Sequence, residues 1–227
     1  MPVTWIVTDL GGVCIGDVHF PFLADYAQRR GWGGDILIRL RQAHNRAWQE
    51  AKIKDGSETE YWDNIIRLAG ITDPTVTGTL FCDLVRKNGF LDLLPNTHSV
   101  LEEARRGGYH LGILSNHLSE QTDYIFEQHP EFVKTFEPGV ILVSSQLGLA
   151  KPDPAIFAAL MQRIRAQDPT AQPANVAFID DKSENISQAR SLGFQAICFR
   201  AERDSPDKLR RELEALGVHL AAAEDRN

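Results

Sequence analysis

The chain has 227 residues, of which 43% are hydrophobic and 24% charged, as in a globular protein large enough to bury a core. Its formal net charge of −7 argues against non-specific nucleic-acid binding, which depends on basic patches, and no apolar stretch is long enough to span a membrane. Three widely spaced cysteines favour reduced thiols over a disulfide framework. We therefore expect a cytoplasmic protein that binds neither nucleic acid nor membrane.

Short apolar runs rich in β-branched residues predict strands, and helical patterns lie between most of them. The clearest helix follows Lys151, where Asp153 is a suitable cap and Pro154 suits the first turn. This alternation predicts an α/β fold with a Rossmann-like parallel sheet and helices on both faces. The predicted strands lie within residues 3–9, 110–115, 140–144, 176–180 and 195–199.

The hydrophobic pattern of residues 16–89 differs from that of the rest of the chain, because it predicts several helices and no convincing strand. Three of the four tryptophans, Trp32, Trp48 and Trp62, lie here. We expect them to form the small core of this segment, with one of them able to line a pocket. The predicted division is a core domain of residues 1–15 and 90–227 and an inserted helical domain of residues 16–89, called the helical insertion below.

Polar groups follow several of the predicted strands, at the point where each apolar run ends. Ligands of open parallel sheets bind at the carboxyl ends of the strands, so we expect these groups to converge. A carboxylate nucleophile, a hydroxyl–amide pair before a helix, a lysine and an acidic pair together predict a site that handles phosphate and a metal. The groups are Asp9, Ser115 and Asn116, Lys151, and Asp180 and Asp181.

The acidic pair Asp180 and Asp181 indicates a cation, because two like charges at one strand end are costly unless a cation neutralises them. Hard oxygen ligands favour Mg²⁺ over zinc, and the sequence has no His/Cys cluster with zinc spacing. Asp9 is best interpreted as a nucleophile. The alternative for Asp9 is a metal ligand or a helix cap alone.

In this order, the motifs resemble those of the haloacid dehalogenase superfamily of phosphohydrolases, and the match covers nearly the whole chain. The resemblance implies that Asp9 and Lys151 are catalytic and that the helical insertion is a cap that closes over the site. The stretch around Asp9 looks most like a sugar 1-phosphatase branch. The resemblance also implies Mg²⁺ held by Asp9, Asp181 and the carbonyl of Gly11, and phosphate bound by Ser115, Asn116, Lys151 and Gly12.

One position departs from the family's pattern. Most phosphatases of the family carry a second aspartate two residues after the nucleophile as general acid and then base, and this chain has Gly11. General acid–base catalysis is typically worth about 10²–10⁴-fold. Asp17, His19 and His117 are candidates for a substitute acid, although a solvent-facing loop histidine is the simpler interpretation of His117.

The leading hypothesis is a Mg²⁺-dependent phosphatase that acts on a small phosphorylated metabolite, such as a sugar phosphate, through an aspartyl-phosphate on Asp9. A 2-haloacid dehalogenase is the rival enzyme, but a halide-displacing site has no use for the Asp180–Asp181 pair. A weakly active or inactive binding protein is the third interpretation. The presence of Asp9, Lys151 and Asp181 argues against it.

Overall fold

The computed structural model describes residues 2–221 and contains one five-stranded parallel sheet in the order β3-β2-β1-β4-β5. Each strand lies inside a run predicted from the sequence, which confirms the predicted fold class. The central strand β1 pairs with β2 on one side and with β4 on the other. The strands are β1 (Trp5–Thr8), β2 (His110–Ser115), β3 (Ile141–Val143), β4 (Val176–Asp180) and β5 (Gln195–Cys198).

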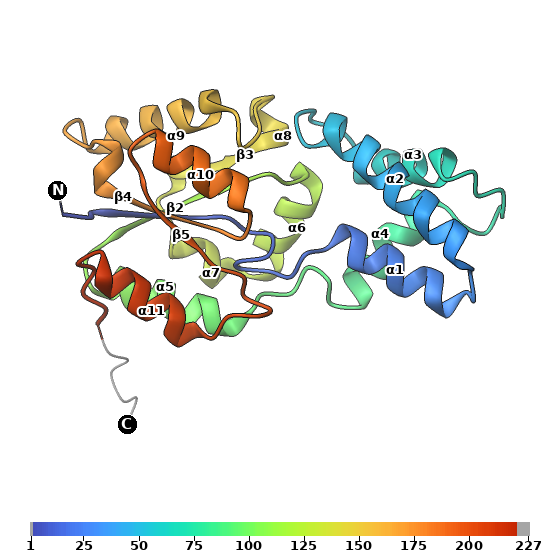
Figure 1. The fold of residues 1–227 in the computed structure, drawn as a ribbon, viewed down its shortest axis with the longest axis horizontal. Coiled ribbons are helices and arrows are strands. Elements are labelled where there is room, and N and C mark those ends of the chain that lie inside the picture. The colour runs from blue at the N-terminus through green and yellow to red at the C-terminus, as the bar shows by residue number, and fades with distance from the viewer. Residues whose placement is uncertain (1, 222–227) are drawn as a thin grey trace.

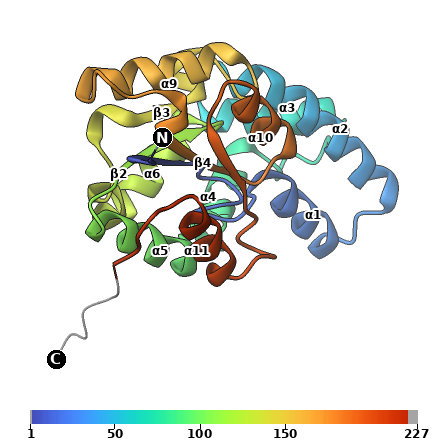
Figure 2. The ribbon, with the colours of Figure 1, turned by 60° about the vertical axis from the view of Figure 1, so that its left-hand side comes forward.

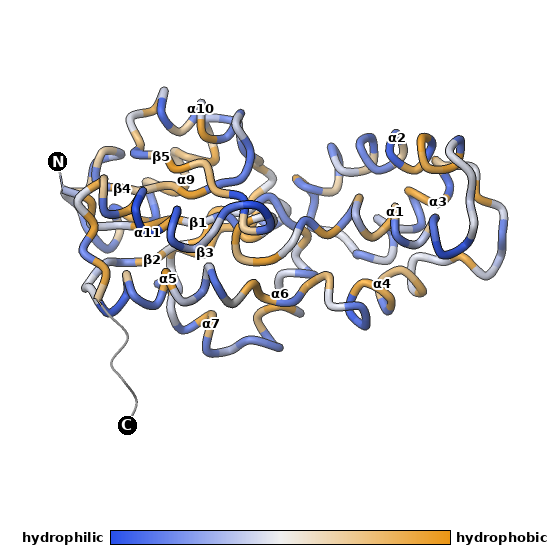
Figure 3. The backbone as a smooth tube through the Cα atoms, turned by 60° about the horizontal axis from the view of Figure 1, so that its bottom comes forward, coloured by the Kyte–Doolittle hydropathy of each residue, from blue (hydrophilic) through white to orange (hydrophobic). Residues whose placement is uncertain are grey.

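Helices cover both faces of the sheet (Figures 1 and 2). Successive residues of β1 alternate between these faces, as strand geometry requires: Trp5 and Val7 pack under one helix layer and Ile6 under the other. The strands accordingly carry hydrophobic stretches between the two helix layers, in the left-hand part of Figure 3. One layer holds α9 (Pro154–Gln167) and α10 (Ser183–Ser191), and the other α5 (Pro95–Arg106), α7 (Pro130–Lys134) and α11 (Pro206–Ala215).

The helical insertion stands beside the carboxyl edge of the sheet (Figure 1). Trp62 is fully buried at its centre and meets Phe22 and Phe81 edge to face, as predicted for a tryptophan core. Trp32 and Trp48 are only partly buried against this cluster. The domain boundaries at residues 16 and 89 stay a prediction. The helices of the insertion are α1 (His19–Arg29), α2 (Gly34–Ala51), α3 (Glu58–Leu68) and α4 (Gly78–Lys87).

Helix α6 (Ser119–Gln128) belongs to the core domain by sequence, but it packs against the helical insertion. Its residue Ile125 is buried in the hydrophobic cluster of the insertion. The amide of Gln121 donates to Glu58 at 2.8 Å, and Arg86 donates to the other oxygen of this fully buried glutamate at 2.6 Å. Helix α6 is therefore a shared element between the two parts.

The cysteines agree with the reduced thiols expected from their number and spacing. Cys14, Cys82 and Cys198 are free thiols. Burial raises the pKa of the Cys14 thiol to about 12, so this cysteine is held in its unreactive form. Among the helices of residues 2–221, none combines the length and apolar character needed to cross a bilayer.

Candidate active site

Asp9 follows β1 at the centre of the carboxyl edge, and the residue is 5% exposed. One carboxylate oxygen, Oδ1, accepts from Ser115 Oγ at 2.6 Å and from the backbone N–H of Leu10 at 2.8 Å. The other oxygen, Oδ2, lies 2.9 Å from Lys151 Nζ. Both oxygens are therefore held, which fixes the carboxylate in one orientation. The structure thus brings together the predicted residues Asp9, Ser115 and Lys151.

The ammonium of Lys151 is completely buried and has three oxygen neighbours. Besides Asp9, it donates to Asp180 Oδ2 at 2.6 Å and to the carbonyl of Leu114 at 2.7 Å. Burial alone would lower the pKa of this lysine, but the charges of Asp180 and Asp9 outweigh it, so its pKa lies above the ordinary value. Lys151 is therefore a fixed positive charge beside Asp9.

Asn116 holds the main chain of this lysine. Its side-chain oxygen accepts from the backbone N–H of Lys151 at 2.9 Å, and its amide nitrogen donates to the backbone carbonyl of Lys151, also at 2.9 Å. The pair of bonds links the end of β2 to the loop before α9. The observed side-chain contacts of Asn116 thus position Lys151, while its predicted phosphate contact stays a prediction.

The neighbours Asp180 and Asp181 have different surroundings. Asp180 is completely buried and accepts from Lys151, from the backbone N–H of Lys182 at 2.8 Å and, with both oxygens, from Asn185 at 3.0 Å. Within residues 2–221, by contrast, the buried Oδ1 of Asp181 has no hydrogen-bond partner. Adjacent residues at a strand end point in opposite directions, which explains this division.

Asp9, Asp180 and Asp181 each place one carboxylate oxygen within 4.8 Å of the others. Burial raises the pKa of Asp181 to about 6, against the lowering charge of Lys182 and with a further upward contribution from Asp9. A cation would relieve this crowding of negative charge and provide a partner for Asp181 Oδ1. Three carboxylates are a donor set that suits a hard cation such as Mg²⁺.

The two glycines after Leu10 differ in whether a larger residue could replace them. Gly12 has φ +74°, and a Cβ atom there would lie 2.7 Å from Asp181 Cγ, so only glycine fits. Its carbonyl accepts from the backbone N–H of Ala201 at 3.0 Å. Gly11 lines the cavity described next, has no left-handed φ, and a Cβ atom added there would meet nothing within 4 Å. An aspartate could therefore occupy position 11.

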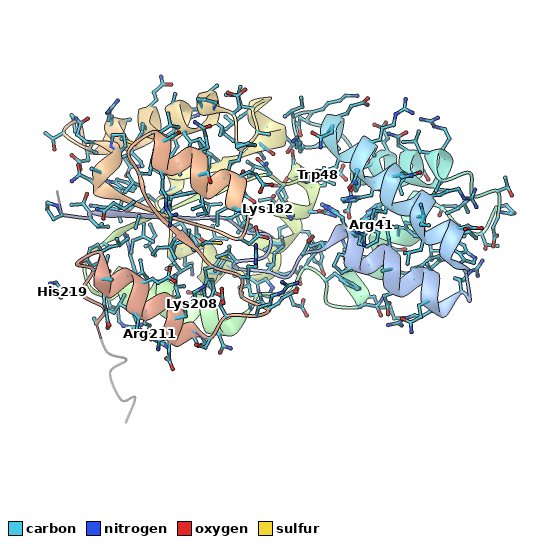
Figure 4. All side chains as sticks on the ribbon, viewed as in Figure 1. Arg41, Trp48, Lys182, Lys208, Arg211 and His219 are labelled. Atoms are coloured by element: carbon cyan, nitrogen blue, oxygen red, sulfur yellow. The ribbon has the colours of Figure 1, made fainter. Side chains whose placement is uncertain are left out.

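A cavity of about 300 Å³ separates the sheet edge from the helical insertion. Asp9, Lys151 and Asp181 lie on its sheet side. In Figure 4, Lys182, the residue before α10, points toward this junction, and Trp48 of α2 lies on the opposite side. The cavity therefore has a charged floor and an aromatic wall contributed by the insertion.

Two of the three candidate substitute acids are unsuited to that role. The expectation that His117 faces solvent was wrong: it is 3% exposed because α6 packs over it, and burial lowers its pKa to about 4. His19 is also buried, and burial followed by the neighbouring charges of His44 and His117 lowers its pKa well below the ordinary range. Both rings are neutral near pH 7. Asp17 lines the cavity and remains a candidate.

Sequence reasoning missed several residues of the cavity wall. His44 lies one turn before Trp48 on α2, so its spacing from that tryptophan could have placed it on the same face. Trp48 itself lines the cavity, as expected for one of the three tryptophans. Lys182 was also missed, although it directly follows the acidic pair. These side chains surround the space above Asp9 where a bound molecule would extend.

The family model for haloacid dehalogenase-like hydrolases matches residues 3–193. The chain belongs to this family. It is therefore a haloacid dehalogenase-like hydrolase, as its motifs predicted, while the likeness to a sugar 1-phosphatase branch stays a prediction.

Two curated proteins resemble the chain in sequence. Acyl-CoA dehydrogenase family member 10 of Mus musculus is 32% identical over 216 residues, which are 93% of this chain and 19% of the mouse protein. Phosphatase MT3486 of Mycobacterium tuberculosis is 28% identical over 143 residues, which are 62% of this chain and 63% of that phosphatase. The chain thus spans less than two thirds of the length of each relative.

Solved structures of other family members share the fold. A HAD family enzyme of Bacteroides thetaiotaomicron matches with a TM-score of 0.68 and 20% identity, over 92% of this chain and 100% of that one. The L-2-haloacid dehalogenase of Xanthobacter autotrophicus matches with a TM-score of 0.58 and 18% identity, over 96% of this chain and 84% of that one. At this level of identity, the likeness establishes the fold alone.

Proposed function

We propose that the chain is a Mg²⁺-dependent phosphatase that hydrolyses a small phosphomonoester through an aspartyl-phosphate on Asp9. The observation that carries this proposal is the Asp9 carboxylate, held by Ser115 and Lys151 beside an Asp181 oxygen that has no hydrogen-bond partner among the described residues. The mycobacterial relative is named a phosphatase, and the Bacteroides enzyme has been solved in complex with magnesium and inorganic phosphate. Free thiols fit a cytoplasmic enzyme.

In the proposed reaction, Asp9 Oδ2 attacks phosphorus and the bond to the ester oxygen breaks, so the leaving group departs and the phosphoryl group stays on Asp9. Water then attacks phosphorus, the Asp9–phosphorus bond breaks, and inorganic phosphate leaves. Lys151 supplies fixed positive charge for the phosphoryl oxygens. Mg²⁺, bound by Asp9, Asp181 and the carbonyl of Gly11, would neutralise further charge on the phosphoryl group.

The rival activity is the displacement of halide from a 2-haloacid, because a dehalogenase is among the structural neighbours. The three clustered carboxylates favour the phosphatase, since halide displacement needs no cation. The deciding experiment measures phosphate release from sugar phosphates, short phosphorylated acids and p-nitrophenyl phosphate, with MgCl₂ and with EDTA. Chloride release from 2-chloropropionate is measured in parallel. Chloride release without phosphate release would establish the rival.

Mg²⁺ binding is expected to weaken in acid, because Asp181 must lose its proton to bind the cation. With a pKa of about 6 for Asp181, most of this carboxyl is ionised at neutral pH and most is protonated one unit below 6. The apparent Mg²⁺ affinity should therefore be about tenfold lower near pH 5 than near pH 7.5. Isothermal titration calorimetry at the two pH values measures it, and equal affinities would contradict the assignment of Asp181 as a ligand.

The rate is expected to depend steeply on the leaving group, because Gly11 offers no proton to the departing oxygen. Aryl, acyl and anomeric sugar phosphates should react fastest and glycerol phosphate slowest. Gly11→Asp should accelerate the slow esters by about 10²-fold, the low end for general acid catalysis, since the structure leaves room for the side chain. The measurement is kcat/KM across phosphate esters of graded leaving-group pKa.

Asp17→Asn is the control for that series, because Asp17 is a cavity-lining carboxyl outside the metal cluster and a candidate substitute acid. If wild type shows little dependence on the leaving group and Asp17→Asn restores it, Asp17 is the proton donor. A flat dependence in both proteins would refute the idea that proton donation is missing.

A further inference from the structure

His117 lies directly after Asn116 and lines the cavity. Its ring is buried, and within residues 2–221 its Nε2 atom has no hydrogen-bond partner. Buried polar side-chain atoms in native proteins nearly always have a partner. The unpaired nitrogen of this cavity-lining residue therefore needs an explanation, and the proposed reaction gives it no role.

The hydrogen bonds of the other ring nitrogen determine what Nε2 can do. Nδ1 lies 3.1 Å from Thr122 Oγ1 and 3.3 Å from the carbonyl of Leu118. The Thr122 hydroxyl donates its own hydrogen to this carbonyl at 3.0 Å, so both neighbours of Nδ1 can only accept. Nδ1 must therefore carry the ring hydrogen, and in the neutral ring Nε2 is left with a lone pair.

The side chains near His117 include two further uncharged groups, Gln121 and His19. The amide nitrogen of Gln121 donates to Glu58, so the amide oxygen of Gln121 faces His19 and accepts from its Nε2 at 3.0 Å. The ring of His19 lies 6.3 Å from that of His117 and 4.7 Å from that of Trp48, between ring centres. The wall near His117 thus combines an acceptor with flat aromatic surface.

We propose that His117 is a specificity-determining residue whose Nε2 accepts a hydrogen bond from a hydroxyl group of the leaving group. The preferred substrates are then phosphate monoesters of polyhydroxy compounds, with their C–H faces against Trp48. A second carboxylate or phosphate in contact with Nε2 would meet a lone pair instead of a donor, which disfavours such a group at this position. This inference rests on the proposed phosphatase activity and adds the chemical class of the substrate.

The test compares kcat/KM of wild type, His117→Phe and His117→Gln on three kinds of probe. α-D-Glucose 1-phosphate and D-ribose 5-phosphate carry hydroxyl groups, p-nitrophenyl phosphate carries none, and phosphoglycolate carries a second anion. Phenylalanine keeps the ring and removes the acceptor, whereas the amide of glutamine reaches the place of Nε2. For each substrate, the kcat/KM of a variant is divided by that of wild type. The leaving group is the same in both reactions, so its pKa does not affect this ratio.

His117→Phe should lower kcat/KM on the two sugar phosphates by about 10- to 100-fold, mainly through KM, as expected for an unpaired hydrogen-bonding group in a substrate pocket. The p-nitrophenyl phosphate and phosphoglycolate values should stay within about threefold, well below such a loss. His117→Gln should recover part of the loss on the sugar phosphates.

Three results would overturn the inference. Equal losses on every probe would mean that His117 only supports the fold. The largest loss on phosphoglycolate would mean that the pocket selects a second anion. A wild-type enzyme that hydrolyses p-nitrophenyl phosphate but neither sugar phosphate would refute the substrate class. A wild type inactive on every probe would instead refute the proposed phosphatase function.

Discussion

Asp9→Asn is expected to lower kcat on p-nitrophenyl phosphate by at least about 10⁴-fold, a loss typical for removal of a covalent nucleophile. The amide has nearly the shape of the carboxylate but lacks the charge and nucleophilicity needed to attack phosphorus. Within residues 2–221, Asp180 and Asp181 are the carboxylates that cluster with Asp9. Asp180 is engaged by Lys151 and Asn185, so it is not free to replace Asp9.

The loss should not come from unfolding, because the buried ammonium of Lys151 keeps Asp180, its nearer carboxylate, at 2.6 Å. In Asp9→Asn, the side-chain oxygen can still accept from Ser115 and from the backbone N–H of Leu10, as Oδ1 does now. Circular dichroism and the thermal midpoint Tm serve as the control. A folded Asp9→Asn protein with the wild-type rate on p-nitrophenyl phosphate would refute the proposed mechanism.

Asp180→Asn and Asp181→Asn are expected to change stability in opposite directions. Asp180→Asn removes the carboxylate closest to the buried ammonium of Lys151, and breaking a buried ion pair costs about 3–5 kcal/mol. For a chain of this size, the Tm should fall by about 6–20 °C. Asp181→Asn should raise the Tm of the metal-free protein at pH 7.5, because the folded state disfavours this charge: it raises the pKa from 3.8 to about 6.

Mg²⁺ separates the two variants further. At a concentration of about 100 times Kd, Mg²⁺ should stabilise wild type by about 2.7 kcal/mol. The Asp181→Asn variant should lose most of this response, while Asp180→Asn should keep it. Differential scanning fluorimetry with MgCl₂ and with EDTA measures both effects. Equal Mg²⁺ responses in the two variants would show that Asp181 is no more a ligand than Asp180.

The fold could be predicted from the sequence because its signals are local. Each strand lies inside an apolar run, and Asp153 caps α9 with a bond to the backbone N–H of Ala155 at 2.8 Å. The convergence of Asp9, Ser115 and Lys151 followed from one rule, that the carboxyl ends of parallel strands meet at one edge. Residues nearly 150 positions apart could thus be assigned to a single site.

The remaining features depend on packing that no local pattern encodes. The burial of His117 results from the way α6 lies against the helical insertion, and amphipathic periodicity does not say which neighbour a helix chooses. The sequence placed two acids at the end of β4, but their different partners depend on the position of the Lys151 side chain. The side-chain contacts of Asn116 with the main chain of Lys151 could not be predicted either, because they join two segments that are distant in the sequence.

The shared helix α6 has a consequence for recombining this protein with its relatives. A domain exchange cut at residues 16 and 89 would leave behind Gln121, the partner of the buried carboxylate of Glu58. It would also separate Ser119 from Asp55, which are joined by a hydrogen bond of 2.6 Å. The transferable unit is therefore discontinuous, and a new insertion has to bring its own version of α6. Substrate preference and the segment that carries Ser115 and His117 would then be inherited together.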